Sequence, residues 1–450
     1  MDDRQNFTSG PILKKLMLFA MPVLAALFLQ AMYGAVDLWA VGRFGTTADM
    51  SAVSTGSQAM LVVTGFVTGL CMGITVLLGK RMGEKNYEKA AEILGAAVWI
   101  LGILSVVVTI GIIVLAPVIA DFVNSPEEAF SKNVAYLRIC GIGTVFIVAY
   151  NGLSGIFRGL GNSKIPLLFV FISCIANIVG DIVLIEFFKL GAAGAAIATV
   201  GSQAVSVLFS AVYIRKKGMP FEVRKSAFKF RRDTAAEIVK LGMPIALSDM
   251  CNEICYLIII GYTNELGVVV SAGVGVAEKI IVFLLLIPMA YMASVSSFTA
   301  QNIGAGKQDR AVKATFLGMA AAGAMGLVLS YILAFHGDLL SLAFVRDTEV
   351  INASATFLKA TALECLILSV ANCFVGYFNG KGKTTFVMTQ GLISIFLVKI
   401  PYGWIALRYM ENKLFQIGLA TVWGAVFTLC ICIIYFVYDD KKSKKLTIKS

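Results

Sequence analysis

The sequence is poor in charged residues. Only 14% of its 450 residues are Asp, Glu, Lys or Arg, whereas 58% are hydrophobic and the mean hydropathy is +0.84. A soluble domain has about 25% charged and about 45–50% apolar residues. A soluble protein of this composition would have too little polar surface to face water. The excess apolar surface must face lipid, which places the chain among the membrane proteins.

Residues that could build a metal centre are also scarce. The single histidine, His336, is expected in a loop, and the nine cysteines contain no two C-x-x-C pairs. Because a structural zinc ion needs several Cys or His ligands together, we expect no metal centre of this kind, no organic cofactor, and cysteines that pack in the core. A membrane-embedded enzyme is therefore disfavoured, and we expect that the protein is not an enzyme.

A nucleotide-binding loop is missing as well. Gly382-Lys383-Thr384 resembles the end of a phosphate-binding loop, but Tyr377 stands where the motif requires its first glycine. Gly304 to Lys307 fails too, because Gln308 replaces the Ser or Thr. We expect energy from an ion gradient rather than from ATP.

Long apolar runs dominate what is present. A spanning helix needs about 20 mostly apolar residues, and we identify about twelve such segments, the first of them a spanning helix rather than a cleaved signal. Continuous runs of this kind are not typical of a membrane β-barrel. The segments are roughly 16–41, 52–79, 92–118, 134–157, 165–187, 191–214, 238–262, 270–299, 312–335, 354–377, 386–407 and 415–438.

The basic residues predict the orientation of these helices. With both termini in the cytoplasm, the termini and cytoplasmic loops hold 28 of the 38 Lys and Arg residues, and the opposite loops hold 6. This bias follows the positive-inside rule. The net charge of +11 then reflects topology and contact with anionic lipid, and we expect no nucleic acid partner.

The two halves of the chain resemble each other. A shift of about 221 residues aligns Met21-Pro22 closely with Met243-Pro244, and Gly83 with Gly304. We therefore predict an N-lobe at 1–214, a basic cytoplasmic linker at 215–237, a C-lobe at 238–438 and a basic cytoplasmic tail at 439–450. Transporters place their binding sites near the midplane between such repeats.

Ionisable residues inside the first half mark a candidate site, because each costs roughly 2.5–3.5 kcal/mol at the bilayer centre. Tyr33 and Asp37 share a helical face with Gln30. Asn177 and Asp181 are four residues apart on a later helix. If these helices meet, carboxylate, amide and hydroxyl oxygens converge, which suits a proton relay or a small cation. The alternative is a polar cluster that only holds helices together.

The second half carries further polar residues in its predicted helices. They could line a substrate cavity or form structural ion pairs, for example between Glu364 and Lys399. With residues of the first half, the candidate substrate-cavity set is Gln30, Asn151, Asp249, Asn252, Glu253, Glu278 and Glu364.

Several short motifs, in this order, resemble the multidrug and toxic compound extrusion (MATE) family over nearly the whole chain. They are Pro22, Val36-Asp37, Val41-Gly42-Arg43 with Gly45, Gly79 to Glu84, Phe157-Arg158-Gly159-Leu160-Gly161, Asn177 to Asp181, and Gln301 to Gly306. The resemblance implies an all-α polytopic membrane protein of bacterial type, with twelve helices in two pseudo-symmetric six-helix lobes that form a V.

The resemblance also implies a function. It indicates a monomeric multi-pass transporter of the inner (cytoplasmic) membrane that exports organic, cationic or amphipathic compounds, including xenobiotics, in exchange for H⁺ or Na⁺ by alternating access. The family's cation site corresponds here to Asp37, Asn177, Asp181 and Thr199, where Na⁺ could bind, with Tyr33 nearby. Among Asp249, Asn252 and Glu253 of the predicted span 238–262, Glu253 is the preferred match to a glutamate of the family. A lipid-linked flippase of the same superfamily is the main alternative, but acids outnumber bases within the predicted helices.

Overall fold

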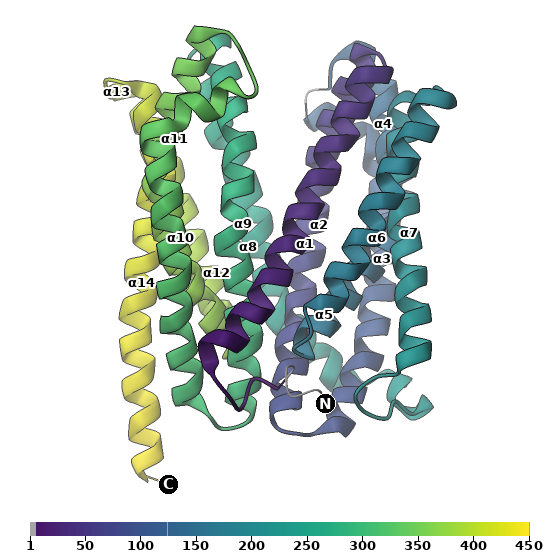
Figure 1. Ribbon diagram of the computed structural model, residues 1–450, viewed down its shortest axis with the longest axis vertical. Helices are drawn as coiled ribbons and strands as arrows, with labels where there is room; N and C mark the ends of the chain where they lie inside the picture. The colour runs from purple at the N-terminus through teal and green to yellow at the C-terminus, as the bar shows by residue number, and fades with distance from the viewer. Residues whose placement is uncertain (1–5, 124, 450) are drawn as a thin grey trace. The chain divides into compact units, whose positions relative to one another are not determined.

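The computed structural model describes residues 6–123 and 125–449, and its long elements are α-helices (Figure 1). Within these residues there is no β-strand. Eleven helices are long and apolar enough to cross a membrane, and a bent pair of helices passes the same test when its two parts are taken as one span, which gives up to twelve spans. The prediction of an all-α polytopic membrane protein with about twelve spans is confirmed. Arg4 and Ser450, which belong to the predicted cytoplasmic ends, lie outside the described residues.

The helices fall into two groups with the same order. The first group contains α1 (Ile12–Phe44), α2 (Thr47–Gly83), α3 (Tyr87–Phe122), α4 (Glu127–Ile142), α5 (Thr144–Gly159), α6 (Lys164–Asp181) with the π-helix η2 (Ile182–Phe187), and α7 (Gly191–Lys217). The second contains α8 (Arg232–Asn264), α9 (Val268–Gly304), α10 (Gln308–Leu342), α11 (Thr348–Gly380), α12 (Thr384–Ile393) with the π-helix η4 (Ser394–Lys399), α13 (Ile400–Tyr409) and α14 (Lys413–Lys449). The predicted tail is thus a continuation of α14.

The repeat is present in these bounds. Both ends of α9 follow those of α2 by 221 residues, and α11 begins and ends 221 residues after the α4–α5 pair. Each half also carries a π-helix in its fifth crossing, η2 and η4. Two halves with nearly equal helix lengths are what an ancient duplication leaves in a transporter.

By their contacts, the described residues form two compact units, one of Asn6 with Met21–Ala246 and one of Phe7–Ala20 with residues 247–449. Each unit therefore includes the beginning of a helix from the other half, since α1 and α8 are both divided. In the second unit, Phe7 stacks on Phe298 with ring centroids 5.1 Å apart, and its backbone N–H donates to Gln301.

Glycines allow close helix packing at matched positions of the two units. In the first, Gly155 and Gly159 of α5 lie against the backbone of α2, where an added Cβ would stand 3.0 and 2.8 Å from carbonyl oxygens. In the second, Gly376 and Gly380 of α11 lie against α9, at 2.5 and 2.4 Å. Small residues at helix interfaces replace the hydrophobic effect that lipid cannot supply.

Two segments differ from their sequence-based expectation. The predicted span 134–157 is a bent pair, because α4 and α5 meet at 51° around Gly143, which packs against Val200. His336, expected in a loop, lies inside α10, where its φ of −133° and ψ of 23° interrupt the helix. Both breaks depend on packing or local backbone geometry that an apolar run does not encode.

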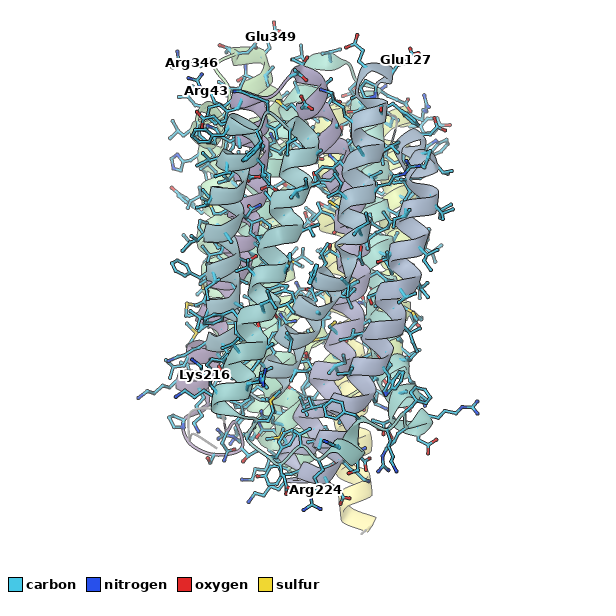
Figure 2. All side chains as sticks on the ribbon, turned by 90° about the vertical axis from the view of Figure 1, so that its right-hand side faces the viewer. Arg43, Glu127, Lys216, Arg224, Arg346 and Glu349 are labelled. Atoms are coloured by element: carbon cyan, nitrogen blue, oxygen red, sulfur yellow. The ribbon has the colours of Figure 1, made fainter. Side chains whose placement is uncertain are left out.

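The segment between α7 and α8 belongs to the first unit and packs on its helix α3. Its short 3₁₀ helix η3 (Lys225–Phe228) lies against α3, where Trp99 donates a 2.8 Å hydrogen bond to the Phe228 carbonyl. Arg231 pairs with Glu92 at 3.1 Å. In this unit, Lys216 and Arg224 lie at the end opposite Arg43 and Glu127 (Figure 2).

Candidate functional site

The core of the site lies where α1, α6 and α7 meet in the first unit. Asp37 of α1 is only 6% exposed, and Thr199 of α7 donates a 3.1 Å hydrogen bond to its Oδ2. Asn177 and Asp181 of α6 are fully buried, and both lie within interaction range of the Asp37 carboxylate. The structure therefore brings together the four residues that the sequence marked from three distant segments.

Local geometry explains how these side chains meet. Gly180 of α6 faces Ala198 of α7, where an added Cβ would stand 3.1 Å from the alanine methyl group. This close approach brings α6 and α7 together next to Asp181 and Thr199, which both adjoin Asp37. The π-helix η2 begins directly after Asp181, and π-helical turns are common at functional sites.

The site has unused hydrogen-bonding capacity. Among the described residues, no hydrogen-bond partner is found for Oδ1 of Asp37, both carboxylate oxygens of Asp181, or the side-chain amide of Asn177. Two neighbouring carboxylates repel each other unless a cation or a proton lies between them. Four oxygen atoms from these three residues, with the Thr199 hydroxyl, are hard donors of the kind that a small cation prefers.

Tyr33 adjoins this cluster through a residue that the sequence analysis missed. Gln203 of α7 is buried, and its Nε2 lies 3.4 Å from the Tyr33 hydroxyl, to which it donates. Gln203 follows Thr199 by four residues, so both face α1. That spacing was readable in the sequence, but a lone glutamine in a helix did not identify its partner.

The other two candidates of the first half lie elsewhere. Gln30 donates a 3.1 Å hydrogen bond to the hydroxyl of Tyr150 on α5. Asn151 is buried between helices, where it accepts from Thr68 at 3.1 Å and donates to the Ile147 carbonyl at 2.9 Å. The side chain of Asn151 thus joins α2 to α5.

In the second unit, the candidate residues have different surroundings. Asn252 and Glu253 of α8 are exposed, whereas Asp249 is half-buried. Glu278 of α9 lies beside Tyr256. Glu364 of α11 is buried and accepts a 2.6 Å hydrogen bond from Thr421 of α14.

Lys399, at the end of η4, is close enough to Glu364 to affect it electrostatically. Its aliphatic stem packs on Gly424 of α14. Glu364 is therefore held inside its unit by α14 and η4, whereas Glu253 is accessible. Among the described residues, no group of three or more His, Cys, Asp or Glu side chains could hold a metal ion.

Comparison with known proteins identifies the fold and the family. The sequence profile of the MatE family matches residues 22–183 and 244–405, one match in each half. The chain is 28% identical over 443 residues to the probable multidrug resistance protein YpnP of Bacillus subtilis, covering 98% of both chains. It is 22% identical over 448 residues to the multidrug export protein MepA of Staphylococcus aureus, covering 96% of each.

Solved structures share the fold over the whole length. An outward-facing multidrug resistance MATE transporter superimposes with a TM-score of 0.90 at 19% identity, with 99% of each chain covered. A MOP superfamily transporter from Pyrococcus furiosus gives 0.88 at 20% identity, again with 99% of each chain covered. Because the family profile covers most of both halves, the chain belongs to the MATE family of membrane transporters and is not an enzyme.

Proposed function

We propose that this transporter exports organic cations or amphipathic compounds in exchange for H⁺ or Na⁺ by alternating access. The observation that carries the proposal is the buried Asp37–Asp181 pair, in which Oδ1 of Asp37 and both carboxylate oxygens of Asp181 lack hydrogen-bond partners within the described chain. A purely structural polar cluster would be expected to satisfy its own hydrogen bonds. An exchangeable cation or proton would be the partner that these carboxylate oxygens lack.

In this mechanism, the coupling ion enters from outside and binds between Asp37 and Asp181. Na⁺ would take oxygen atoms of Asn177 and Thr199 as further ligands, whereas H⁺ would bind one carboxylate and let it donate to the other. Either event removes the repulsion between α1 and α6 and repacks α1. Substrate leaves outward, and the ion is then released to the cytoplasm. The membrane potential contributes about 2.3 kcal/mol per charge per 100 mV.

Substrate would be attracted by acidic side chains of the second half. Glu253 is the preferred residue because it is exposed and carries a negative charge on an apolar helix. An organic cation gains more from such a carboxylate in a poorly hydrated surrounding than in water. Glu364 is less suited to this role because Thr421 already binds its carboxylate.

We further propose that the protein is a monomer in the bacterial cytoplasmic membrane with both termini inside, and that residues 215–237 are a cytoplasmic linker between two lobes. The uneven distribution of Lys and Arg supports this orientation.

Proteoliposomes loaded with a cationic dye test the exchange. A pH gradient and a Na⁺ gradient are imposed separately, and efflux is followed by fluorescence. Efflux driven by one gradient, and abolished by an ionophore that dissipates it, supports antiport. An efflux rate that depends on neither gradient contradicts antiport.

A further inference from the structure

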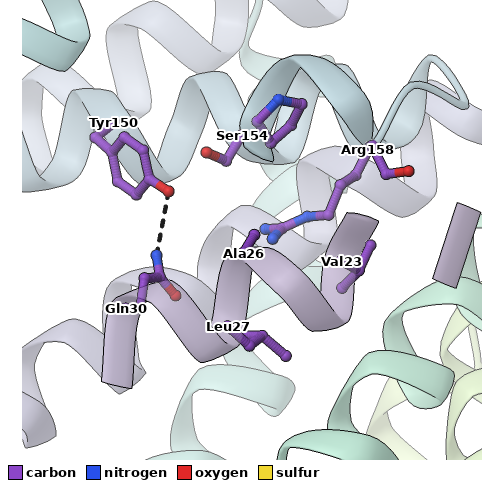
Figure 3. A pocket seen from close by; sticks show the side chains of 9 residues that line it. Val23, Ala26, Leu27, Gln30, Tyr150, Ser154 and Arg158 are labelled. Atoms are coloured by element: carbon purple, nitrogen blue, oxygen red, sulfur yellow. Dashed lines mark hydrogen bonds between the residues drawn. The ribbon is translucent and has the colours of Figure 1, made fainter. Parts of the chain in front are cut away.

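A second polar cavity lies in the first unit, between α1, α5 and the start of α6, and it is cationic. Tyr150, Ser154 and Arg158 follow one another at intervals of four residues, so they share one face of α5. On α1, Val23, Ala26, Leu27 and Gln30 face them (Figure 3). The site described above does not use this arginine, although it belongs to a motif that the sequence analysis singled out.

The guanidinium of Arg158 has no counter-ion within the described chain. Its Nε is buried without a hydrogen-bond partner, and its electrostatic neighbours are Tyr150 and Cys71 rather than a carboxylate. Figure 3 shows the side chain extending along α5 toward Ser154, against Ala26 of α1. The Arg158 side chain as a whole is only partly buried, but desolvating one edge of a guanidinium without a partner is still costly, so such groups are normally paired or bind a ligand.

The remaining groups of the cavity are also suited to donate hydrogen bonds. Ser154 is 3% exposed, and its Oγ has no partner among the described residues. Gln30 donates to the Tyr150 oxygen, which leaves the tyrosine hydroxyl hydrogen free to donate. Ser163, which precedes the 18-residue helix α6, and Pro166 in its first turn complete the lining, and a helix N-terminus carries a partial positive charge.

The size of the cavity restricts what it can hold. Its volume is about 20 Å³, enough for one species near the size of a water molecule. A chloride or bromide ion is of that order, whereas phosphate, sulfate and organic acids are larger. We propose that this cavity binds a small monovalent inorganic anion of the halide class, held by Arg158, Ser154 and Tyr150. Because α1 covers the cavity, the bound anion stabilises the packing of α1 against α5.

The test is a melting experiment on the full-length protein purified in detergent. Sodium gluconate is replaced stepwise by sodium chloride or bromide at constant ionic strength. The wild type should show a saturable rise in melting temperature of a few °C with either halide. The variant Ser154→Ala loses one donor to the anion and should need about ten times more chloride for half of the rise. Ser173→Ala is the matched control, because Ser173 is a buried serine with an unpartnered Oγ outside the cavity. It should respond as the wild type does.

Arg158→Gln distinguishes a ligand site from a structural arginine. It should show no response to halide, and in gluconate it should melt at or above the wild-type temperature, because the uncompensated cation is gone. An equal halide response in the wild type and in Arg158→Gln would mean a general salt effect and would overturn the proposal. A wild type indifferent to halide would overturn it too. If Arg158→Gln does not fold, the two serine variants decide the matter. The proposal is then overturned if Ser154→Ala and Ser173→Ala need the same chloride concentration for half of the rise in melting temperature.

In crystals grown with bromide, an anomalous density peak beside Arg158 should mark the ion, and its absence there contradicts the site.

Discussion

The hydroxyl of Thr199 is the one neutral group with a well-formed hydrogen bond to Asp37 in the described chain. Hydrogen bonds to charged groups contribute roughly 1.5–3 kcal/mol. Thr199→Val should therefore weaken the apparent affinity for the coupling ion about tenfold, whereas Thr199→Ser keeps the hydroxyl and should restore most of it. The measurement is the ion-concentration dependence of efflux in proteoliposomes. If Thr199→Val and Thr199→Ser have the same apparent affinity for the ion, the Thr199 hydroxyl does not contribute to ion binding.

Glu253 gives a second prediction for a single residue. Glu253→Gln keeps the size of the side chain but removes its charge. The transport rate should therefore fall several-fold for cationic substrates and little for neutral ones. Transport rates for a matched pair of substrates provide the measurement. Glu265→Gln is the control. Glu265 directly follows the last residue of α8, and its carboxylate pairs with Arg408. Equal losses for both substrates would indicate a structural or coupling role.

Individual side chains differ in how far the sequence reveals them. Asp37 and Asp181 could be recognised because a carboxylate in an apolar helix needs an explanation. Gln203 and Tyr150 could not, because amides and phenols are tolerated in such helices. Their partners, Tyr33 and Gln30, are 170 and 120 residues distant. Those pairings depend on which helices pack against α1, and no local sequence pattern specifies that.

The linker (residues 215–237), which contains the segment between α7 and α8, is held on α3 by backbone packing more than by charge. An added Cβ on Gly95 of α3 would stand 1.8 Å from the Ala227 carbonyl oxygen. The variant Gly95→Val should push the linker away and destabilise the protein by about 1–3 kcal/mol. Gly102→Val on the same helix is the control, because nothing lies within 4 Å of an added Cβ there. Melting temperatures of both variants provide the comparison, and equal losses would show that only helix propensity is affected.

Charge reversal in the same linker should have a much smaller effect. Arg231 is about half exposed in its pair with Glu92, and surface ion pairs contribute about 0–1 kcal/mol. Arg231→Glu combined with Arg232→Glu should therefore leave efflux largely intact, since many basic neighbours preserve the topology. Efflux normalised to the amount of inserted protein is the readout. A large loss despite normal insertion would give these arginines a role in transport.

For the whole molecule, composition predicts the membrane class, the apolar runs predict the number of spans, and motifs about 221 residues apart predict the repeat. The twelve apolar runs match eleven spanning helices and one bent pair, because burial in lipid imposes a minimum length on each span. The bend at Gly143 and the π-helices η2 and η4 were not predicted. They arise where helices from distant segments pack together, and a bent or π-helical crossing has the same apolar composition as a straight one.

If the Asp37 carboxylate couples an ion to export, a variant without its charge should separate substrate binding from transport. Asp37→Asn keeps the size and much of the hydrogen bonding of the side chain but cannot bind or release charge. The purified variant is assayed for substrate binding and, after reconstitution, for efflux driven by an imposed H⁺ or Na⁺ gradient. We expect a folded protein that still binds substrate but has lost gradient-driven efflux. Efflux at the wild-type rate would contradict it.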